Sequence, residues 1–164
     1  MSGLKTSLKL RIEGADRIAV LGIGSRLRAD DAVGMLVAEN IEKHLKKTCR
    51  KPEVKVFFGE TAPENLTGEI KKFKPTHLII IDSGDTGKKP GTITVISPEE
   101  ETGVSFSTHQ LPTGILIDYL LKFIECRVTV IVIQPKTLTF NHPLSKEATG
   151  AVKALSSTLS QIFS

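Results

Sequence analysis

Three short apolar runs, separated by segments of helical periodicity, constrain the fold of this chain more than any other feature. The runs are RIAVLGI (Arg17–Ile23), HLIIID (residues 77–82) and RVTVIVI (Arg127–Ile133). Continuous runs of this length, rich in Val and Ile, are typical of strands buried on both faces of a parallel sheet. Between the first two runs, residues 31–48 repeat apolar side chains at helical spacing. The alternation predicts an α/β fold with helices on both faces of the sheet.

Two further strands are expected at residues 54–58 and 91–96, and helices at 61–73, 112–124 and 145–163. The link between residues 82 and 91 is too short for a parallel crossover, which needs about a dozen residues or more. The strand at 91–96 is therefore expected to run antiparallel. We expect a three-layer α/β/α sandwich around a mostly parallel, mixed central sheet of about five strands. It forms a single domain over residues 1–164, with a frayed first dozen residues.

Local signals also predict where two helices begin. The sequence TAPE predicts a capping box for the helix 61–73, with Thr61 as the N-cap and Glu64 at the N3 position. Asp30 is expected to cap the first helix in the same way, because an aspartate accepts bonds from the backbone N–H groups at a helix start.

Composition excludes several classes of protein. The 164 residues are 40% hydrophobic and 24% charged, as in an ordinary globular domain. No apolar run approaches the roughly 20 residues of a membrane span, so we expect no membrane insertion and a cytoplasmic location. The net charge is +4, but with one Tyr and no Trp there is no stacking platform for nucleic acid. Cys49 and Cys126 lack the spacing of a zinc site; free thiols are expected, and a bridge between them is left open.

Three segments carry polar side chains to one edge of the expected sheet. GIGSRLRADDAVG (residues 22–34) follows the first apolar run, Asp82 ends the second, and His109 precedes the helix that leads to the third. In an open α/β sheet the binding crevice lies outside the carboxyl ends of the parallel strands. Asp31, Asp82 and His109 then face one crevice. Two carboxylates and an imidazole form a plausible metal-binding set with room for outside ligands.

Alternative interpretations remain at several of these positions. Asp31, like Asp30, could simply stabilise the start of the helix. His142 reaches the same edge and is the second choice for the imidazole. A nucleotide-binding module is disfavoured, because Leu27 stands where the third glycine of GxGxxG belongs and the chain has no GK[ST]. Paired acids also have the wrong sign for a pyrophosphate at a helix start.

The order and spacing of four motifs resemble the nickel–iron hydrogenase maturation endopeptidases, of the type that process the large subunit of formate-hydrogenlyase-like hydrogenases. The motifs are GIGSRLRADDAVG, the stretch from GETAPENL through LIIIDSGD to GTI, STHQLP, and VIQP. Two positions of the first motif differ from the family, which usually has Asn in place of Ser25 and Gly in place of Ala32.

The resemblance implies a function and a set of site residues. The family's metal contacts correspond to Asp31, Asp82 and His109. The implied substrate is the precursor of the hydrogenase large subunit, whose C-terminal extension is removed once. The metal is nickel carried by that substrate, which serves as the recognition handle. The chain would be an aspartyl-type maturation peptidase, that is, a metal-dependent hydrolase. A carboxylate could act as the general base, and Asp31 is our first choice for that role. The alternative is a nickel-binding maturation chaperone without peptidase activity.

Overall fold

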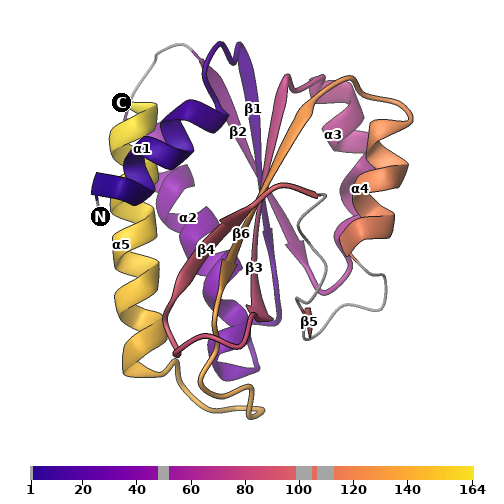
Figure 1. Cartoon of the computed structure of the whole chain (residues 1–164). Helices are drawn as coiled ribbons and strands as arrows, with labels where there is room; N and C mark the ends of the chain where they lie inside the picture. The colour runs from indigo at the N-terminus through magenta and orange to yellow at the C-terminus, as the bar shows by residue number, and fades with distance from the viewer. Residues whose placement is uncertain (1, 48–51, 99–104, 107–112) are drawn as a thin grey trace.

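A central sheet divides the molecule into two helical layers (Figure 1). The computed structural model describes residues 2–47, 52–98, 105–106 and 113–164. Three parallel pairings join β2 to β1, β1 to β3, and β3 to β6, and β4 pairs with β6 in the antiparallel sense. The strands in their order across the sheet are β2 (Glu53–Glu60), β1 (Arg17–Ile23), β3 (His77–Asp85), β6 (Arg127–Ile133) and β4 (Ile93–Ile96).

The mixed sheet and the antiparallel strand expected from the short link are both confirmed. Two features were not expected. Strand β3 continues beyond Asp82 to Asp85, because β6 pairs with it as far as Ser83. The two-residue strand β5 (Ser105–Phe106) then pairs with Gly84 and Asp85 in the antiparallel sense. Asp82 therefore lies inside a strand rather than at its end.

Helices cover both faces, as expected for a three-layer sandwich. In Figure 1, α1 (Ser2–Arg11), α2 (Val33–Leu45) and α5 (Lys146–Phe163) cover one face, and α3 (Thr67–Phe73) and α4 (Thr113–Leu121) cover the other. Within the described ranges, no helix has both the length and the apolar character needed to cross a bilayer.

The expectation of a frayed N-terminus is wrong. Residues 2–11 form α1, and the side chain of Leu8 is only 1% exposed within the hydrophobic cluster that also holds α5. Lys5 Nζ also donates to Gln161 Oε1 on α5, at 2.9 Å. Packing against α5 thus stabilises a segment whose own sequence is only weakly amphipathic.

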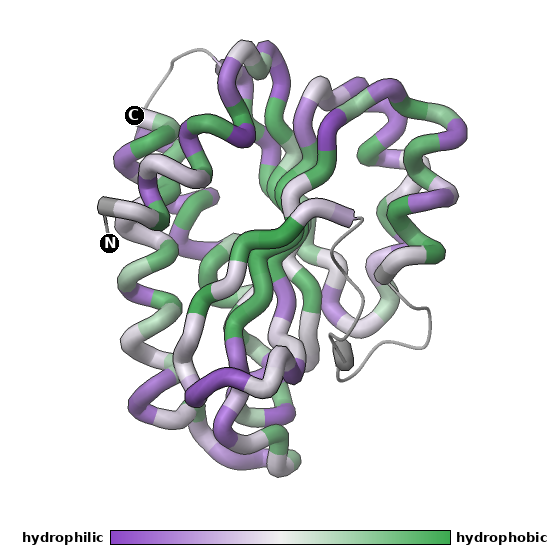
Figure 2. The backbone as a smooth tube through the Cα atoms, viewed as in Figure 1, coloured by the Kyte–Doolittle hydropathy of each residue, from purple (hydrophilic) through white to green (hydrophobic). Residues whose placement is uncertain are grey.

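Side-chain alternation along the strands builds two separate hydrophobic clusters. Ile79 and Ile81 of β3 pack under α2 and α5, whereas Leu78 and Ile80 pack under α3 and α4. Figure 2 shows the resulting pattern, with apolar strands at the centre and polar residues on the outer parts of the helices. Helices bury both faces of the sheet, as the continuous apolar runs predicted.

Close backbone contact fixes α2 against the sheet. A Cβ atom at Gly34 would lie 2.3 Å from the carbonyl oxygen of Ile81 and 2.4 Å from that of Ile23. Only glycine permits this approach. Gly34 therefore holds the start of α2, and the turn before it, directly against the ends of β1 and β3.

The start of α3 differs from the expected capping box. The chain enters α3 through a 3₁₀ turn, η2 (Pro63–Leu66), whose N-cap residue is Ala62, with no side-chain capping bond. Thr61 therefore lies one residue too early to cap the helix. Thr67 Oγ1 instead donates to the carbonyl oxygen of Glu64, at 3.0 Å.

Candidate functional site

Two buried carboxylates meet at the carboxyl edge of the parallel strands, and Ser83 joins them. Asp31, Asp82 and Ser83 are each 0% exposed. Ser83 Oγ donates to Asp31 Oδ1 at 2.7 Å, and the backbone N–H of Ser83 donates to Asp82 Oδ1 at 2.8 Å. Asp31 lies in the 3₁₀ turn η1 (Ala29–Ala32) before α2, and Asp82 lies in β3. The structure thus brings together two of the three residues predicted as metal contacts.

The environment of Asp82 disfavours a negative charge. Burial raises the pKa of Asp82 well above its usual value of 3.8, and the charge of Asp31 raises it further, while the hydrogen bond from the Ser83 N–H acts in the opposite direction. Two adjacent carboxylates in a buried site repel each other when both are ionised. A cation between them would remove this repulsion, so the donor set fits a metal ion.

A tight turn delivers one donor to Asp31. The backbone N–H of Ser25 donates to Asp31 Oδ2 at 2.7 Å. Gly24 has a φ of +138°, and a Cβ atom there would lie 1.8 Å from the carbonyl oxygen of Asp31, so this position requires glycine. The family usually has Asn at position 25, where this chain has Ser. Because the donor is the backbone N–H, this substitution leaves the hydrogen bond to Asp31 in place.

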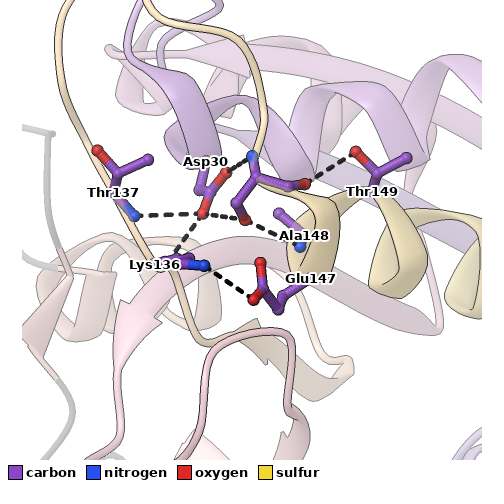
Figure 3. A network of polar contacts seen from close by, with 7 residues as sticks. Asp30, Lys136, Thr137, Glu147, Ala148 and Thr149 are labelled. Atoms are coloured by element: carbon purple, nitrogen blue, oxygen red, sulfur yellow. Dashed lines mark hydrogen bonds and ion pairs between the residues drawn. The ribbon is translucent and has the colours of Figure 1, made fainter.

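Asp30 has a different role from the expected helix cap. It is 0% exposed and lies inside η1, whose N-cap residue is Arg28. Its carboxylate accepts bonds from the loop that joins β6 to α5 (Figure 3). The four donors are Lys136 N at 2.8 Å, Thr137 N at 3.3 Å, Ser145 N at 2.7 Å and Ser145 Oγ at 2.7 Å.

The Asp30 carboxylate therefore connects two loops of the carboxyl edge. Ser145 is itself the N-cap of α5, because its Oγ accepts from the N–H of Ala148 at 3.1 Å. The backbone N–H of Asp30 also donates to the carbonyl oxygen of Thr137, at 3.1 Å. Asp30 thus fixes the position of η1, which carries Asp31, relative to the start of α5.

The histidines fall into different places. His109, predicted as the third metal contact, lies outside the described residues. His142, the second choice, is exposed, and its Nδ1 lies 3.2 Å from the carbonyl oxygen of Phe140. His77 lies at the amino edge and His44 on α2, where its Nε2 contacts Ser164 Oγ at 2.8 Å. Among the described residues, no group of three His, Cys, Asp or Glu side chains is arranged to hold a metal.

A second polar cluster supports the same edge. Gln134 Oε1 accepts from the N–H of Thr86 at 2.7 Å and from its Oγ1 at 3.0 Å, and Gln134 Nε2 donates to Asp85 Oδ1 at 3.2 Å. These contacts join the end of β3 to the end of β6. The N–H of Gly87 and the amide of Gln134 hold the pKa of Asp85 below its usual value.

Cys126, the cysteine within the described residues, gives no sign of chemistry at this site. Cys126 carries a free thiol between α4 and β6, away from the carboxyl edge, and burial raises its pKa. A half-buried thiol with a raised pKa is a poor nucleophile at neutral pH. Cys49 lies outside the described residues, so the bridge left open by the sequence stays untested.

Ser83 is the residue of this site that the sequence did not single out. A serine after a strand-ending aspartate has no distinctive spacing. Its place in the strand could have predicted its contact with Asp31. Side-chain alternation puts Ser83 on the same face as Ile79 and Ile81, which is the face toward α2.

Comparisons with known proteins agree on one family. The family model described as "HycI: Hydrogenase maturation protease" matches residues 37–162. A curated protein of Methanocaldococcus jannaschii, provisionally named a hydrogenase maturation protease, is 33% identical over 163 residues, covering 98% of this chain and 96% of that protein. The Hydrogenase 3 maturation protease of Escherichia coli K12 is 32% identical over 137 residues, covering 83% and 84% of the two chains.

The fold agrees with the same group. The crystal structure of a NiFe hydrogenase maturation protease, HycI, from Thermococcus kodakarensis KOD1 superposes with a TM-score of 0.83 at 28% identity. The superposition covers 95% of this chain and 97% of that one. The layers and strand order described above are therefore those of a solved protease.

Proposed function

The chain belongs to the hydrogenase maturation protease family, and from this premise we propose that it removes the C-terminal extension of a nickel–iron hydrogenase large-subunit precursor that already carries nickel. The protein is a hydrolase of the endopeptidase type. The nickel, its use for recognition and the identity of the precursor are our proposals. We also propose that the reaction takes place in the cytoplasm.

The observation that supports a nickel-bearing substrate is the buried pair of Asp31 and Asp82. Both carboxylates are 0% exposed, and the charge of Asp31 contributes to the raised pKa of Asp82. Such an arrangement costs stability unless a cation is supplied. A substrate that brings its own nickel would supply that cation only when it is correctly assembled. Asp31, Asp82 and His109 would then contact the nickel of the substrate.

Asp31 is proposed to act also as the general base. The Ser25 N–H and the Ser83 hydroxyl each donate to one of its two oxygens, so the carboxylate has a fixed orientation. A base must lie within hydrogen-bond reach of the proton that it removes, and a fixed carboxylate meets this condition reproducibly. The nickel would polarise the scissile carbonyl or lower the pKa of the attacking water.

A nickel chaperone without peptidase activity, the alternative considered from the sequence, is not favoured. The family model and the curated relatives are those of proteases. A nucleotide-binding module is not favoured for the same reason.

The test is to incubate the protein with the purified large-subunit precursor, with and without nickel. We expect one cut near the C-terminus of the nickel-loaded precursor, seen as a single mass change, and none in the nickel-free form. Equal cleavage of both forms would refute recognition through nickel while leaving the protease activity intact. Binding without any cut would support the chaperone.

A further inference from the structure

Two large apolar side chains are exposed at the carboxyl edge of the sheet. Leu27 is 60% exposed and Phe140 is 66% exposed. They come from the turn before η1 and from the loop between β6 and α5. The N–H of Asn141 donates to the carbonyl oxygen of Leu27 at 2.7 Å, so the backbones on which the two side chains stand are direct neighbours. We call Leu27 and Phe140 the apolar pair.

Leu27 of the apolar pair lies on the same turn as the residues that bond Asp31. Leu27 N donates to Ser25 Oγ at 3.2 Å, and Ser25 N donates to the carboxylate of Asp31. The same turn closes with the bond from Asp31 N to the carbonyl oxygen of Arg28, at 3.0 Å. Leu27 therefore stands on the turn that orients the Asp31 carboxylate.

The backbone under the apolar pair is held firmly. Asp30 is bonded to Lys136, Thr137 and Ser145 of the Phe140 loop. Within that loop, Thr139 N donates to Thr137 Oγ1 at 3.3 Å. Exposed apolar side chains on a backbone held by several hydrogen bonds, three of them to the buried Asp30 carboxylate, are preorganised for contact, because little backbone freedom is lost when a partner covers them.

The size of the apolar pair decides between two kinds of partner. Two side chains of this type offer on the order of 200 Å² of apolar surface. A stable interface between two copies of the chain needs about 1,200 Å² or more in total. The pair is therefore too small to hold a dimer, but it suits one or two side chains of an extended polypeptide.

We propose that the apolar pair is a docking surface for apolar side chains of the substrate polypeptide next to the bond that is cut. This inference rests on the proposed function, which brings the substrate polypeptide to Asp31, and Leu27 stands on the turn that orients the Asp31 carboxylate. The apolar pair positions the substrate polypeptide, and the buried carboxylates take part in the hydrolysis.

The experiment compares Leu27→Ser and Phe140→Ser with two matched control variants. Leu10→Ser and Phe123→Ser alter the same residue types at 64% and 60% exposure, on α1 and just after α4, away from the carboxyl edge. For each protein, kcat and KM are measured with the nickel-loaded precursor, and Kd is measured by biolayer interferometry. Melting curves verify that every variant is folded, as expected for exposed positions.

We expect KM and Kd to rise about 10-fold for each variant of the apolar pair, from the loss of apolar burial, with kcat unchanged. Both controls should match the wild type. Unchanged KM and Kd in Leu27→Ser and Phe140→Ser would overturn the proposal, as would equal effects in the controls. A wild-type dimer that either substitution dissociates, with KM unchanged, would show that a second copy is the partner.

The two proposals can fail separately. If the wild type binds the precursor but does not cut it, the catalytic proposal fails and the Kd values still decide on docking. If the wild type neither binds nor cuts the precursor, both the proposed function and the proposed docking surface are refuted.

Discussion

The two edges of the sheet both carry ionisable groups, but the amino edge pairs opposite charges near solvent, whereas the carboxyl edge buries two acidic groups side by side. At the amino edge, Arg17 lies 3.4 Å from Glu53 and stacks on the ring of Phe73 at 4.5 Å. His77 shares a contact of 3.0 Å with Thr76 Oγ1. At the carboxyl edge, Asp31 and Asp82 place two carboxyl groups near each other without exposure to solvent, and the pKa of Asp82 is raised well above its usual value.

We propose that this difference separates residues that stabilise the fold from residues that take part in the reaction. Opposite charges and neutral polar groups stabilise a sheet edge at little cost. Adjacent buried carboxylates destabilise the folded chain, so their presence points to a ligand that needs them. Substitutions at the carboxyl edge should therefore affect activity more than stability, with Asp30 as the exception, and those at the amino edge should do the reverse.

The largest effect is expected from Asp31→Asn and Asp82→Asn. Each substitution keeps the size of the side chain and removes a negative charge that the nickel of the substrate would need. Cleavage of the nickel-loaded precursor should fall more than about 100-fold, beyond the usual effect of losing an outer partner of a metal site. Melting temperatures should stay near or above that of the wild type, because a buried charge is lost. Full activity in either variant would remove that residue from the site.

Asp30→Asn should give the opposite result from its neighbour. The carboxylate accepts four bonds, three of them from backbone N–H groups, and an amide can reproduce only part of this set. The N–H₂ group would face at least one buried donor, so we expect a loss of about 2–4 kcal/mol in the free energy of unfolding. Urea unfolding measures this loss, and cleavage at low temperature should fall less than in Asp31→Asn. An inactive Asp30→Asn with wild-type stability would show that the roles of the two aspartates are reversed.

Thr76→Val tests the amino edge with a change of similar shape. Thr76 Oγ1 accepts from the N–H of Asp16 at 3.1 Å and donates to the carbonyl oxygen of Arg17 at 3.1 Å. Losing these bonds should lower the free energy of unfolding by about 1–2 kcal/mol. The rate of cleavage by the folded enzyme should not change. A lower kcat with normal stability would contradict the separation of the two edges.

The smallest effect is a difference in pH dependence between the edges. Burial, and secondly Arg127, hold the pKa of His77 below 6.5. The folded state therefore binds this proton less readily than the unfolded state, and stability is lost as the pH falls from 6.5 through the lowered pKa. For Asp82, whose pKa is raised above 3.8, stability instead falls as the pH rises from 3.8 through the raised pKa.

Urea unfolding of the metal-free protein across pH 3.5 to 8 measures both contributions. His77→Asn should remove the loss of stability below pH 6.5, and Asp82→Asn should remove the fall with rising pH. Identical pH profiles of the two variants and the wild type would mean that neither group is perturbed by its surroundings.

Much of this architecture follows from patterns within short windows of sequence. Strands β1 and β6 have the predicted bounds, because a continuous apolar run is a local signal of a buried strand. The approach of Asp31 to Asp82 follows from one further rule, that the carboxyl ends of parallel strands share an edge. The assignment of metal ligands, including His109, stays a prediction.

The features that sequence reasoning missed depend on contacts between distant segments. Helix α1 has little periodicity of its own and is held by α5. The bonds of Asp30 join residues 106 to 115 positions apart, in a loop with no regular pattern. Ser83 reaches Asp31 only because the fold places β3 next to η1. No window of sequence contains both partners of such contacts.

The long separation between Asp30 and its partners has a consequence for biosynthesis. We expect the contacts between Asp30 and residues 136–145 to form after the more local packing of β1 with α2 and β2, because closing a long loop costs more entropy and slows folding. A nascent chain still lacking residues 136–145 has no donors for the Asp30 carboxylate. The ribosome must therefore synthesise more than a hundred residues after Asp30 before these four bonds can join the turn that carries Asp31 to the loop before α5.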